Sequence, residues 1–357
     1  MIQKTNESKI CLIYTGGTIG MQRDSGGILS PPEDANSFLN VAPELKELAD
    51  FDYVPLMNKD STNMNQGDWT TISDTIHAIY QERKYDGFVV AHGTDTMHFS
   101  ASAVALALGA NINFPVVFTG AQTAPDVQHG DARINLLRAF KVAASDIAEV
   151  VISFGDYVFR GCRAQKKDER KFDAFESPAF FPLAYITENI LVSSSAKRRK
   201  DSNGLIECKS KFAKGIFQVA LIPGLEPELM KGLIDDPACK GIILHSFGAG
   251  NVPNEFPYSL TDFIRHSTQN GTPVLIASQF PANATLHTAY EPGREAIKAG
   301  AIPTGNMTSA CATAKFRWVL AQVDELDLNR KKRQEKITEM MNKSYIGELD
   351  EVNDNQE

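Results

Sequence analysis

The sequence predicts an α/β protein with two domains: a larger N-terminal domain, in which helices cover a mostly parallel sheet, and a smaller C-terminal α/β domain. Short apolar runs alternate with amphipathic stretches along most of the chain, a pattern typical of parallel strands joined by helices. The 357 residues are enough for two domains. Polar residues interrupt the alternation at residues 195–214, where we expect the linker between the domains.

Apolar runs and helical stretches define the expected N-terminal domain, residues 1–194. The expected strands are residues 10–14, 88–91, 116–119 and 150–154, with a hairpin-like return at 157–160. The expected helices are residues 97–108 and 132–144. Thr96 or Asp95 lies near the start of the first helix, and Asp131 can cap the second. Strands that alternate with helices favour a parallel sheet covered on both faces.

The alternation resumes in the expected C-terminal domain, residues 215–345. The expected strands there are residues 216–222, 242–244 and 274–277, and the expected helices are residues 310–323 and 330–341. The last stretch, residues 346–357, is acidic and has few large apolar side chains. We therefore expect a disordered acidic tail at the end of the chain.

Composition excludes several classes of partner. The net charge of −8 argues against nucleic acid, because phosphate binding needs a basic face. No apolar run reaches the roughly 18 residues that suggest a membrane span, and the polar start of the chain does not resemble a signal peptide. The cysteines are dispersed without a CxxC pair, which fits a reducing compartment. We expect a cytoplasmic protein that binds neither membrane nor nucleic acid.

Two threonine-containing turns carry the chemistry. Thr18 follows two glycines after the expected strand 10–14, and Thr94 with Asp95 follows a glycine after the expected strand 88–91. Loops at the carboxyl ends of parallel strands form one crevice, in which ligands bind. A threonine hydroxyl needs a base to act as a nucleophile, and a neighbouring carboxylate can orient that base. Each turn alone fits a capping threonine, but the pair favours hydroxyl-nucleophile chemistry.

Other kinds of chemistry lack their motifs. The chain contains no Walker A loop, no complete GxGxxG and no GxSxG elbow. His92 and His98 lie close in sequence but have no HExxH pattern or third ligand, so we expect no metal and no cofactor. Residues 21–30, which include two glycines, are expected to form a mobile flap beside Thr18 that can exclude water.

The two turns together resemble the two signature segments of the asparaginase family, and the cytoplasmic type I group most closely. The signature segments are residues 15–21 and 92–97. The similarity covers nearly the whole chain apart from the acidic tail, through residues 54–57, 60–64, 118–122, 131–137, 160–178 and 246–251. The resemblance implies hydrolysis of the side-chain amide of L-asparagine to L-aspartate and ammonia. It also implies a threonine acyl-enzyme and no cofactor.

The resemblance implies a role for each catalytic residue. Thr18 matches the nucleophile that attacks the amide carbonyl. Thr94 and Asp95 match part of a second catalytic group, whose lysine is matched by Lys166 or its neighbour Lys167, and better by Lys166. A lysine acts as a base only when it is partly deprotonated, so it should be desolvated or otherwise shifted.

The resemblance also implies a substrate-binding set: Ser61, Thr62, Asp95, Ala121 and Asn251. Ser61 and Thr62 match positions that hold the α-carboxylate, and Asp95 should bind the α-ammonium. Ala121 matches a backbone contact to the amide group. Asn251 matches a position that reaches the site from another subunit, so a homodimer or homotetramer is implied.

Simpler interpretations stay open for some of these residues. Lys166 lies in a charged run and fits an ordinary surface lysine. Ser61 and Thr62 fit caps of a helix around residues 69–81, although Asp68 caps that helix better. Asn251 fits a turn former shortly before a proline.

The chain also departs from the family pattern. Family members carry a tyrosine in the flap that assists the nucleophile, whereas Ile28 occupies the matching place here. Regulated relatives carry Thr, Arg and Cys at an effector site, where this chain has Gln165, His245 and Phe280. We therefore expect no activation by asparagine through that site.

Two other functions share these motifs. The amidase subunit of a tRNA-dependent amidotransferase carries a sizeable N-terminal extension, whereas the first signature begins at residue 15 here and the chain is acidic. A non-catalytic sensor would keep the site to bind asparagine or aspartate, and the missing flap tyrosine favours it. Release of ammonia from asparagine separates an enzyme from a sensor.

Overall fold

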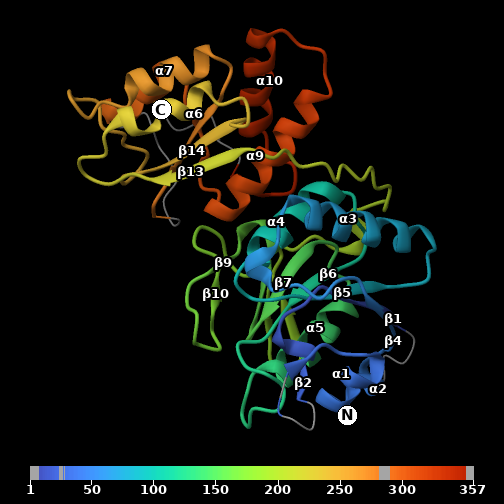
Figure 1. Ribbon diagram of the computed structural model, residues 1–357. Coiled ribbons are helices and arrows are strands. Elements are labelled where there is room, and N and C mark those ends of the chain that lie inside the picture. Colours follow the sequence, from blue (N-terminus) through green and yellow to red (C-terminus); the bar gives the residue numbers. More distant parts are fainter. Residues whose placement is uncertain (1–7, 24–26, 28, 281–289, 351–357) are drawn as a thin grey trace. The chain divides into compact units, whose positions relative to one another are not determined.

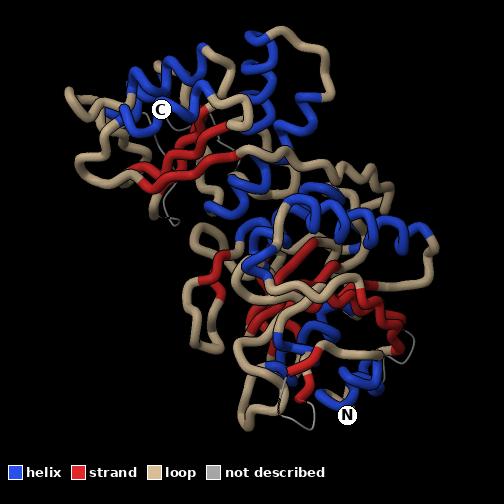
Figure 2. The backbone as a smooth tube through the Cα atoms, viewed as in Figure 1, coloured by secondary structure: helices blue, strands red, loops and turns tan. Residues whose placement is uncertain are grey.

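The computed structural model describes residues 8–23, 27, 29–280 and 290–350 of the chain. It divides into two compact units, Met1–Ser210 and Lys211–Glu357 (Figure 1). Each unit has its own largely parallel sheet with helices packed on it (Figure 2). The expected fold class is confirmed. In the parts of the chain that the structure describes, no helix is long and apolar enough to cross a bilayer.

The main sheet of the first unit has eight strands in the order β12-β11-β8-β7-β6-β5-β1-β4. Strands β4, β1, β5, β6 and β7 are parallel, and β8, β11 and β12 continue the sheet in antiparallel fashion. Their bounds are β1 Lys9–Tyr14, β4 Asp50–Pro55, β5 Gly87–Ala91, β6 Val116–Thr119, β7 Val150–Phe154, β8 Tyr157–Arg160, β11 Ala184–Ile186 and β12 Ile190–Val192. Two small hairpins lie outside this sheet: β2 Gln22–Arg23 with β3 Leu29–Ser30, and β9 Gln165–Lys166 with β10 Phe175–Glu176.

Helices cover both faces of this sheet (Figure 1). Helix α5 and the short helices α1 and α2 pack with alternate residues of β1, such as Ile10 and Leu12, in one core. Helix α4 packs on β6 and β7 and is covered by α3. The helices are α1 Ala35–Val41, α2 Leu45–Leu48, α3 Gln66–Gln81, α4 Met97–Leu108 and α5 Ala132–Ala143. Parallel strands covered in this way are buried on both faces, which explains the continuous apolar runs of β1, β5, β6 and β7.

The start of one helix and the capping of another differ from the expectation. Helix α3 begins at Gln66, with Asn65 as its N-cap and Asp68 in the third helical position of a capping box. Asp68 therefore does not start the helix, because its carboxylate reaches back to the backbone N–H of Asn65, at 2.8 Å. Asp131 occupies the N-cap position of α5 but makes no side-chain cap bond, and its carboxylate binds a neighbouring turn instead.

The described residues between β12 and β13 form one short 3₁₀ helix, η4 Arg199–Asp201, and are otherwise irregular. Arg199 fastens this stretch to the first unit, since its Nη2 donates to the carbonyls of Asp86, at 2.8 Å, and Ser145, at 2.9 Å. The chain then continues without regular structure to β13.

The second unit contains a four-stranded parallel sheet in the order β13-β14-β15-β16. The strands are β13 Ile216–Ala220, β14 Gly241–Ser246, β15 Val274–Ser278 and β16 Ile302–Pro303. The helices are α6 Lys231–Asp235, α7 Thr261–Gln269, α8 Glu291–Lys298, α9 Ser309–Asp324 and α10 Arg330–Asn342. Apolar residues of β14, β15, α6, α7 and α8 form its core.

The acidic end of the chain is folded further than expected. Glu348 and Lys315 are both fully buried, and Lys315 Nζ lies 2.8 Å from Glu348 Oε1. Lys315 Nζ also donates to the carbonyls of Met341, at 2.8 Å, and Lys343, at 2.6 Å. A disordered tail from residue 346 is therefore wrong for residues 346–350, because the buried ammonium of α9 needs this carboxylate. Residues 351–357 lie outside the described residues.

We expect Glu348→Gln to lower the free energy of unfolding by about 3–5 kcal/mol, because it leaves the buried Lys315 ammonium without its counter-charge. Urea denaturation measures the change. The matched control is Glu325→Gln, whose carboxylate pairs with Lys211 at the surface and should matter far less. Equal effects of the two changes would contradict this expectation.

The same pair should make stability depend on pH. Burial opposes ionisation of Glu348, but the Lys315 ammonium and backbone N–H groups outweigh it, so the pKa of Glu348 lies below its ordinary value. The difference in unfolding free energy between wild type and Glu348→Gln should therefore have its largest value above the ordinary glutamate pKa. It should be lost as the pH falls through the lowered pKa of the folded state.

Candidate active site

Four loops meet at the carboxyl edge of the main sheet, because β4, β1, β5 and β6 are parallel neighbours. The loops are residues 56–64, 15–21, 92–96 and 120–123. Glycines in the loop at residues 15–21 let its backbone contact the backbones of the loops at residues 56–64 and 92–96. Gly17 has a φ of +84°, and a Cβ there would lie 2.6 Å from the Gly93 backbone nitrogen. A Cβ at Gly16 would collide with the Lys59 carbonyl.

Thr18 begins the 3₁₀ helix η1 Thr18–Gly20 directly after this contact. Its hydroxyl donates to the carbonyl of Ala121, at 2.8 Å, so the loop after β1 touches the loop after β6. A carbonyl cannot take up the hydroxyl proton, and nucleophilic attack by Thr18 therefore needs a further base. The buried Tyr14 supports the turn, since its hydroxyl donates to the Gly17 carbonyl at 3.1 Å.

A second cluster joins the other predicted catalytic residues. Lys166 Nζ donates to Thr94 Oγ1, at 2.9 Å, and lies 2.6 Å from Asp95 Oδ1. The Thr94 hydroxyl donates in turn to Gln122 Oε1, at 3.1 Å. The Lys166 side chain is 12% exposed and that of Asp95 is 54% exposed, so the ion pair lies at the border of bulk water. As arranged, Nζ is a donor, and Lys166 acts as a base only after losing a proton.

The β9–β10 hairpin delivers the lysine to this cluster. Lys166 pairs with Phe175 in the hairpin, and the backbone N–H of Lys167 donates to the Ala174 carbonyl at 2.8 Å. The Lys167 ammonium lies elsewhere, 2.8 Å from Asp173. The structure therefore brings Lys166, and not its neighbour, to Thr94.

Ser61 and Thr62 form the start of the 3₁₀ helix η2 Ser61–Asn63. Ser61 is buried against the second turn: a Cβ at Gly93 would lie 2.6 Å from its Oγ, and its carbonyl accepts from Thr96 Oγ1 at 2.7 Å. Thr62 is exposed and donates to Asp60 at 2.7 Å. The alternative that these residues cap helix α3 is wrong, because that helix starts beyond them.

Sequence reasoning missed Gln122. Its side chain accepts from Thr94, and its Nε2 donates to the carbonyls of Asp168 and Lys171, both at 3.3 Å. It therefore links the threonine to the chain segment just after Lys166. The available signal was its position directly after Ala121 in a matched family segment.

The two histidines near the cluster are neutral. Burial lowers the pKa of His92 to about 4, and burial followed by the Lys166 charge lowers the pKa of His98 to about 4. His92 Nδ1 lies 2.7 Å from the Gly93 carbonyl, so His92 acts as a hydrogen-bonding residue of the turn. The described residues contain no group of three or more His, Cys, Asp or Glu side chains that could hold a metal.

Three of the remaining predicted positions, His245, Asn251 and Phe280, lie in the second unit. Asn251 lies in the second unit in a tight turn, where its N–H donates to the Phe247 carbonyl at 2.8 Å. Of the effector positions, His245 ends near Gln218 with its pKa lowered by burial, and Phe280 is exposed. Ile28 lies outside the described residues.

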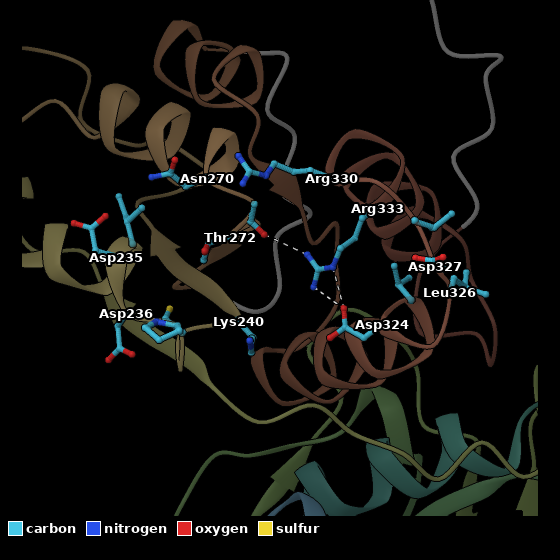
Figure 3. Close-up of a pocket in the computed structure, with 16 residues that line it drawn as sticks. Asp235, Asp236, Lys240, Asn270, Thr272, Asp324, Leu326, Asp327, Arg330 and Arg333 are labelled. Atoms are coloured by element: carbon cyan, nitrogen blue, oxygen red, sulfur yellow. Dashed lines mark hydrogen bonds and ion pairs between the residues drawn. The ribbon is translucent and has the colours of Figure 1, made fainter.

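A cavity of about 600 Å³ in the second unit holds none of the predicted residues (Figure 3). It lies where α6, α7 and α9 end and α10 begins. Arg333 spans part of it by donating to Asp324, at 2.9 Å, and to the Gly271 carbonyl, at 3.2 Å. Arg330 likewise donates to the Gln269 carbonyl, at 2.9 Å, so the protein itself holds both arginines. The candidate active site is therefore the loop cluster of the first unit.

Comparison with known proteins now identifies the family. Residues 9–198 match the family model "Asparaginase, N-terminal", and residues 216–333 match "Glutaminase/Asparaginase C-terminal domain". The chain therefore belongs to the asparaginase family, which confirms the resemblance seen in its two threonine turns.

Similar proteins carry two different names. The chain is 33% identical over 352 residues to a glutamyl-tRNA(Gln) amidotransferase subunit of Aeropyrum pernix, covering 95% of this chain and 81% of that protein. It is 33% identical over 349 residues to L-asparaginase 1 of Escherichia coli K12, covering 96% and 98%. The solved structure of the thermostable L-asparaginase from Thermococcus kodakarensis aligns with a TM-score of 0.87 and 28% identity, covering 96% of this chain and 100% of that one. These likenesses establish the family and leave the acceptor of the amide group open.

We expect Gly17→Ala to destabilise the first unit more than Gly109→Ala does. Both glycines have positive φ and extended ψ, 84° and 166° for Gly17 and 73° and −175° for Gly109, a region that costs other residues about 1–3 kcal/mol. A Cβ at Gly109 would meet nothing within 4 Å, whereas one at Gly17 would meet the backbone of Gly93. Urea denaturation compares the two, and equal losses would contradict the close backbone contact.

Proposed function

We propose that this protein hydrolyses the side-chain amide of L-asparagine to L-aspartate and ammonia through an acyl-enzyme on Thr18. One observation carries the proposal. In a chain of the asparaginase family, Lys166 Nζ touches both Thr94 and Asp95 at the same sheet edge as Thr18. This arrangement combines a hydroxyl nucleophile with a second group that can move protons.

In the first half of the reaction, Thr18 Oγ1 attacks the amide carbonyl carbon, and its hydroxyl proton passes through the Thr94 hydroxyl to neutral Lys166, which later gives it to the leaving nitrogen. The C–N bond of the tetrahedral intermediate then breaks, the nitrogen takes a proton and leaves as ammonia, and Thr18 is left as an ester. We propose that the Ala121 carbonyl, which accepts from Thr18 here, accepts from the amide nitrogen when substrate is bound. Water hydrolyses the ester in the second half and restores the hydroxyl.

Proton transfer falls to the second cluster in this proposal. The Thr94 hydroxyl lies between Lys166 Nζ and Gln122 Oε1, so it can pass a proton when the lysine is neutral. Asp95 orients Nζ and is exposed enough to meet the α-ammonium of the substrate. Ser61 and Thr62 then hold the α-carboxylate, and Asn251 of a second subunit completes the site in a homodimer or homotetramer.

Specificity for asparagine over glutamine rests on pocket length. One methylene is worth roughly 10–200-fold in kcat/KM, so some glutaminase activity is part of the proposal. We also propose that the protein works in the cytoplasm and that asparagine does not activate it through Gln165, His245 and Phe280.

Amide transfer is the second candidate, because a relative named as a glutamyl-tRNA(Gln) amidotransferase subunit matches at 33% identity, the same as an L-asparaginase. A transferase must break the same C–N bond, so both candidates need the same cluster. Ammonia release from L-Asn, D-Asn and L-Gln by the purified protein, without a partner, decides between them. Fast release from L-Asn supports hydrolysis, and release only from L-Gln favours amide transfer. A protein that binds asparagine without releasing ammonia is the sensor.

We expect Thr18→Ala to lower kcat for ammonia release by on the order of 10³-fold or more, because the acyl-enzyme cannot form. Thr18→Ser keeps a hydroxyl at the same place and should retain measurable turnover. Thermal unfolding should show that both variants stay folded. Near-normal turnover in Thr18→Ala would exclude Thr18 as the nucleophile.

Lys166→Met and Thr94→Val should each lower kcat by about 10²–10⁴-fold, since both remove a link of the proton path. The double variant should be little worse than either single variant, because the two side chains act as a unit. Lys167→Met is the matched control: it removes the neighbouring lysine of the same hairpin, which pairs with Asp173, and should leave turnover intact. Losses that multiply in the double variant would contradict a shared path.

A further inference from the structure

One turn of the first unit touches both threonine hydroxyls. This turn, the β6 turn, comprises residues 120–123 and follows β6. The Ala121 carbonyl accepts from Thr18, at 2.8 Å, and the Gln122 side chain accepts from Thr94, at 3.1 Å. The orientation of two hydroxyls that belong to different loops therefore depends on the conformation of the β6 turn.

The Asp131 carboxylate accepts hydrogen bonds from two residues of the β6 turn. Asp131 is 3% exposed. Its two oxygens accept from the Gln122 backbone N–H at 3.1 and 2.9 Å, and Oδ1 also accepts from the Thr123 N–H at 3.1 Å and the Thr123 hydroxyl at 3.0 Å. Hydrogen bonds to a carboxylate are stronger than neutral ones, so this carboxylate fixes the backbone at the centre of the turn.

Asn135 holds the other side of the same turn. It is 1% exposed and lies one helical turn after Asp131 on the same face of α5. Its Nδ2 donates to the Gly120 carbonyl, at 3.0 Å, and to Asp131 Oδ2, at 3.1 Å, and its Oδ1 accepts from the Gly155 N–H at 3.1 Å. The first turn of α5 therefore binds the β6 turn at both ends and ties it to the end of β7.

The β6 turn has no room to shift toward the neighbouring loop. A Cβ at Gly120 would collide with the His92 carbonyl and would lie 3.3 Å from Thr94 Cγ2. A turn that is packed on one side and held by buried side chains on the other has one conformation. Its carbonyl and amide oxygens can then be placed within a narrow tolerance.

We propose that Asp131, supported by Asn135, is a positioning residue for the reaction: it fixes the β6 turn so that Ala121 and Gln122 orient the hydroxyls of Thr18 and Thr94. The inference rests on the proposed function. Asp131 touches neither hydroxyl, and its side chain does not cap its own helix. It acts through the turn, where a displacement of about 1 Å can cost about 10²-fold in rate.

Asp131→Asn tests the inference. The asparagine amide has nearly the same shape as the carboxylate, but an NH2 group replaces one of the two oxygens. This NH2 group is a donor and would face the N–H and O–H donors of Gln122 and Thr123. We expect kcat to fall by about 10- to 100-fold. KM should change less, because the β6 turn supplies only Ala121 to the proposed substrate-binding set, whereas Ser61, Thr62 and Asp95 lie on other loops. Thr123→Val is a milder variant, which removes one bond to Asp131 and should lower kcat in the same direction.

Glu149→Gln is the matched control. Glu149 is 7% exposed, accepts from a backbone N–H, that of Lys197 at 2.7 Å, and pairs with Arg160. It lies just before β7, at the amino-terminal ends of the parallel strands, whereas the loop cluster lies at their carboxyl ends. Both variants should lower the midpoint of thermal unfolding, but only Asp131→Asn should lower kcat.

Hydrogen exchange of the backbone amides at residues 122 and 123 provides a readout independent of activity. Exchange should become faster in Asp131→Asn and stay as in wild type in Glu149→Gln. Normal kcat in Asp131→Asn, or equal losses of kcat in the two variants, would overturn the inference, as would unchanged exchange. A wild-type protein that releases no ammonia, with faster exchange in Asp131→Asn, would overturn the proposed function and support the hold of Asp131 on the turn.

Discussion

The contact between Gly17 and Gly93 is the constraint on which the rest of the site depends. Strands β1 and β5 lie side by side with Tyr14 opposite Ala91, so their loops leave the sheet at the same level. The loops approach so closely that a Cβ at Gly17 would fall 2.6 Å from the Gly93 nitrogen. Each glycine is followed by a threonine, and the contact therefore sets the separation of the two hydroxyls.

Local sequence patterns were sufficient for three of the four strands that lead into the site, β1, β5 and β6. Strands β1, β5, β6 and β7 are buried on both faces, so each is a continuous apolar run that stands out in the sequence. Strand β4 was not expected, because it lies at the sheet edge and carries exposed Asp50 and half-exposed Asp52. The start of α3 was misplaced because Asn65 and Asp68 are both capping residue types, and only the capping box shows which one begins the helix.

Long-range partners could not be read from the sequence. Lys166 reaches Thr94 across 72 residues, on a strand of two residues that is too short to show any periodicity, so only the family resemblance pointed to it. Asp131 was expected to cap α5, but the N–H groups of a turn eight or nine residues earlier compete for its carboxylate. The acidic composition of the tail predicted disorder, whereas the buried ammonium of Lys315 requires Glu348.

The position of Lys166 depends on apolar packing of its hairpin against a neutral histidine. The hairpin partner of Lys166 is the buried Phe175, whose ring lies 4.9 Å from that of Phe154 and 6.2 Å from that of His98. Burial first, and then the nearby Lys166 charge, keep the pKa of His98 at about 4. A charged imidazole here would repel the Lys166 ammonium and weaken its pairing with Asp95. The same apolar contacts that anchor the hairpin therefore keep His98 uncharged and preserve the local electrostatics on which the lysine depends.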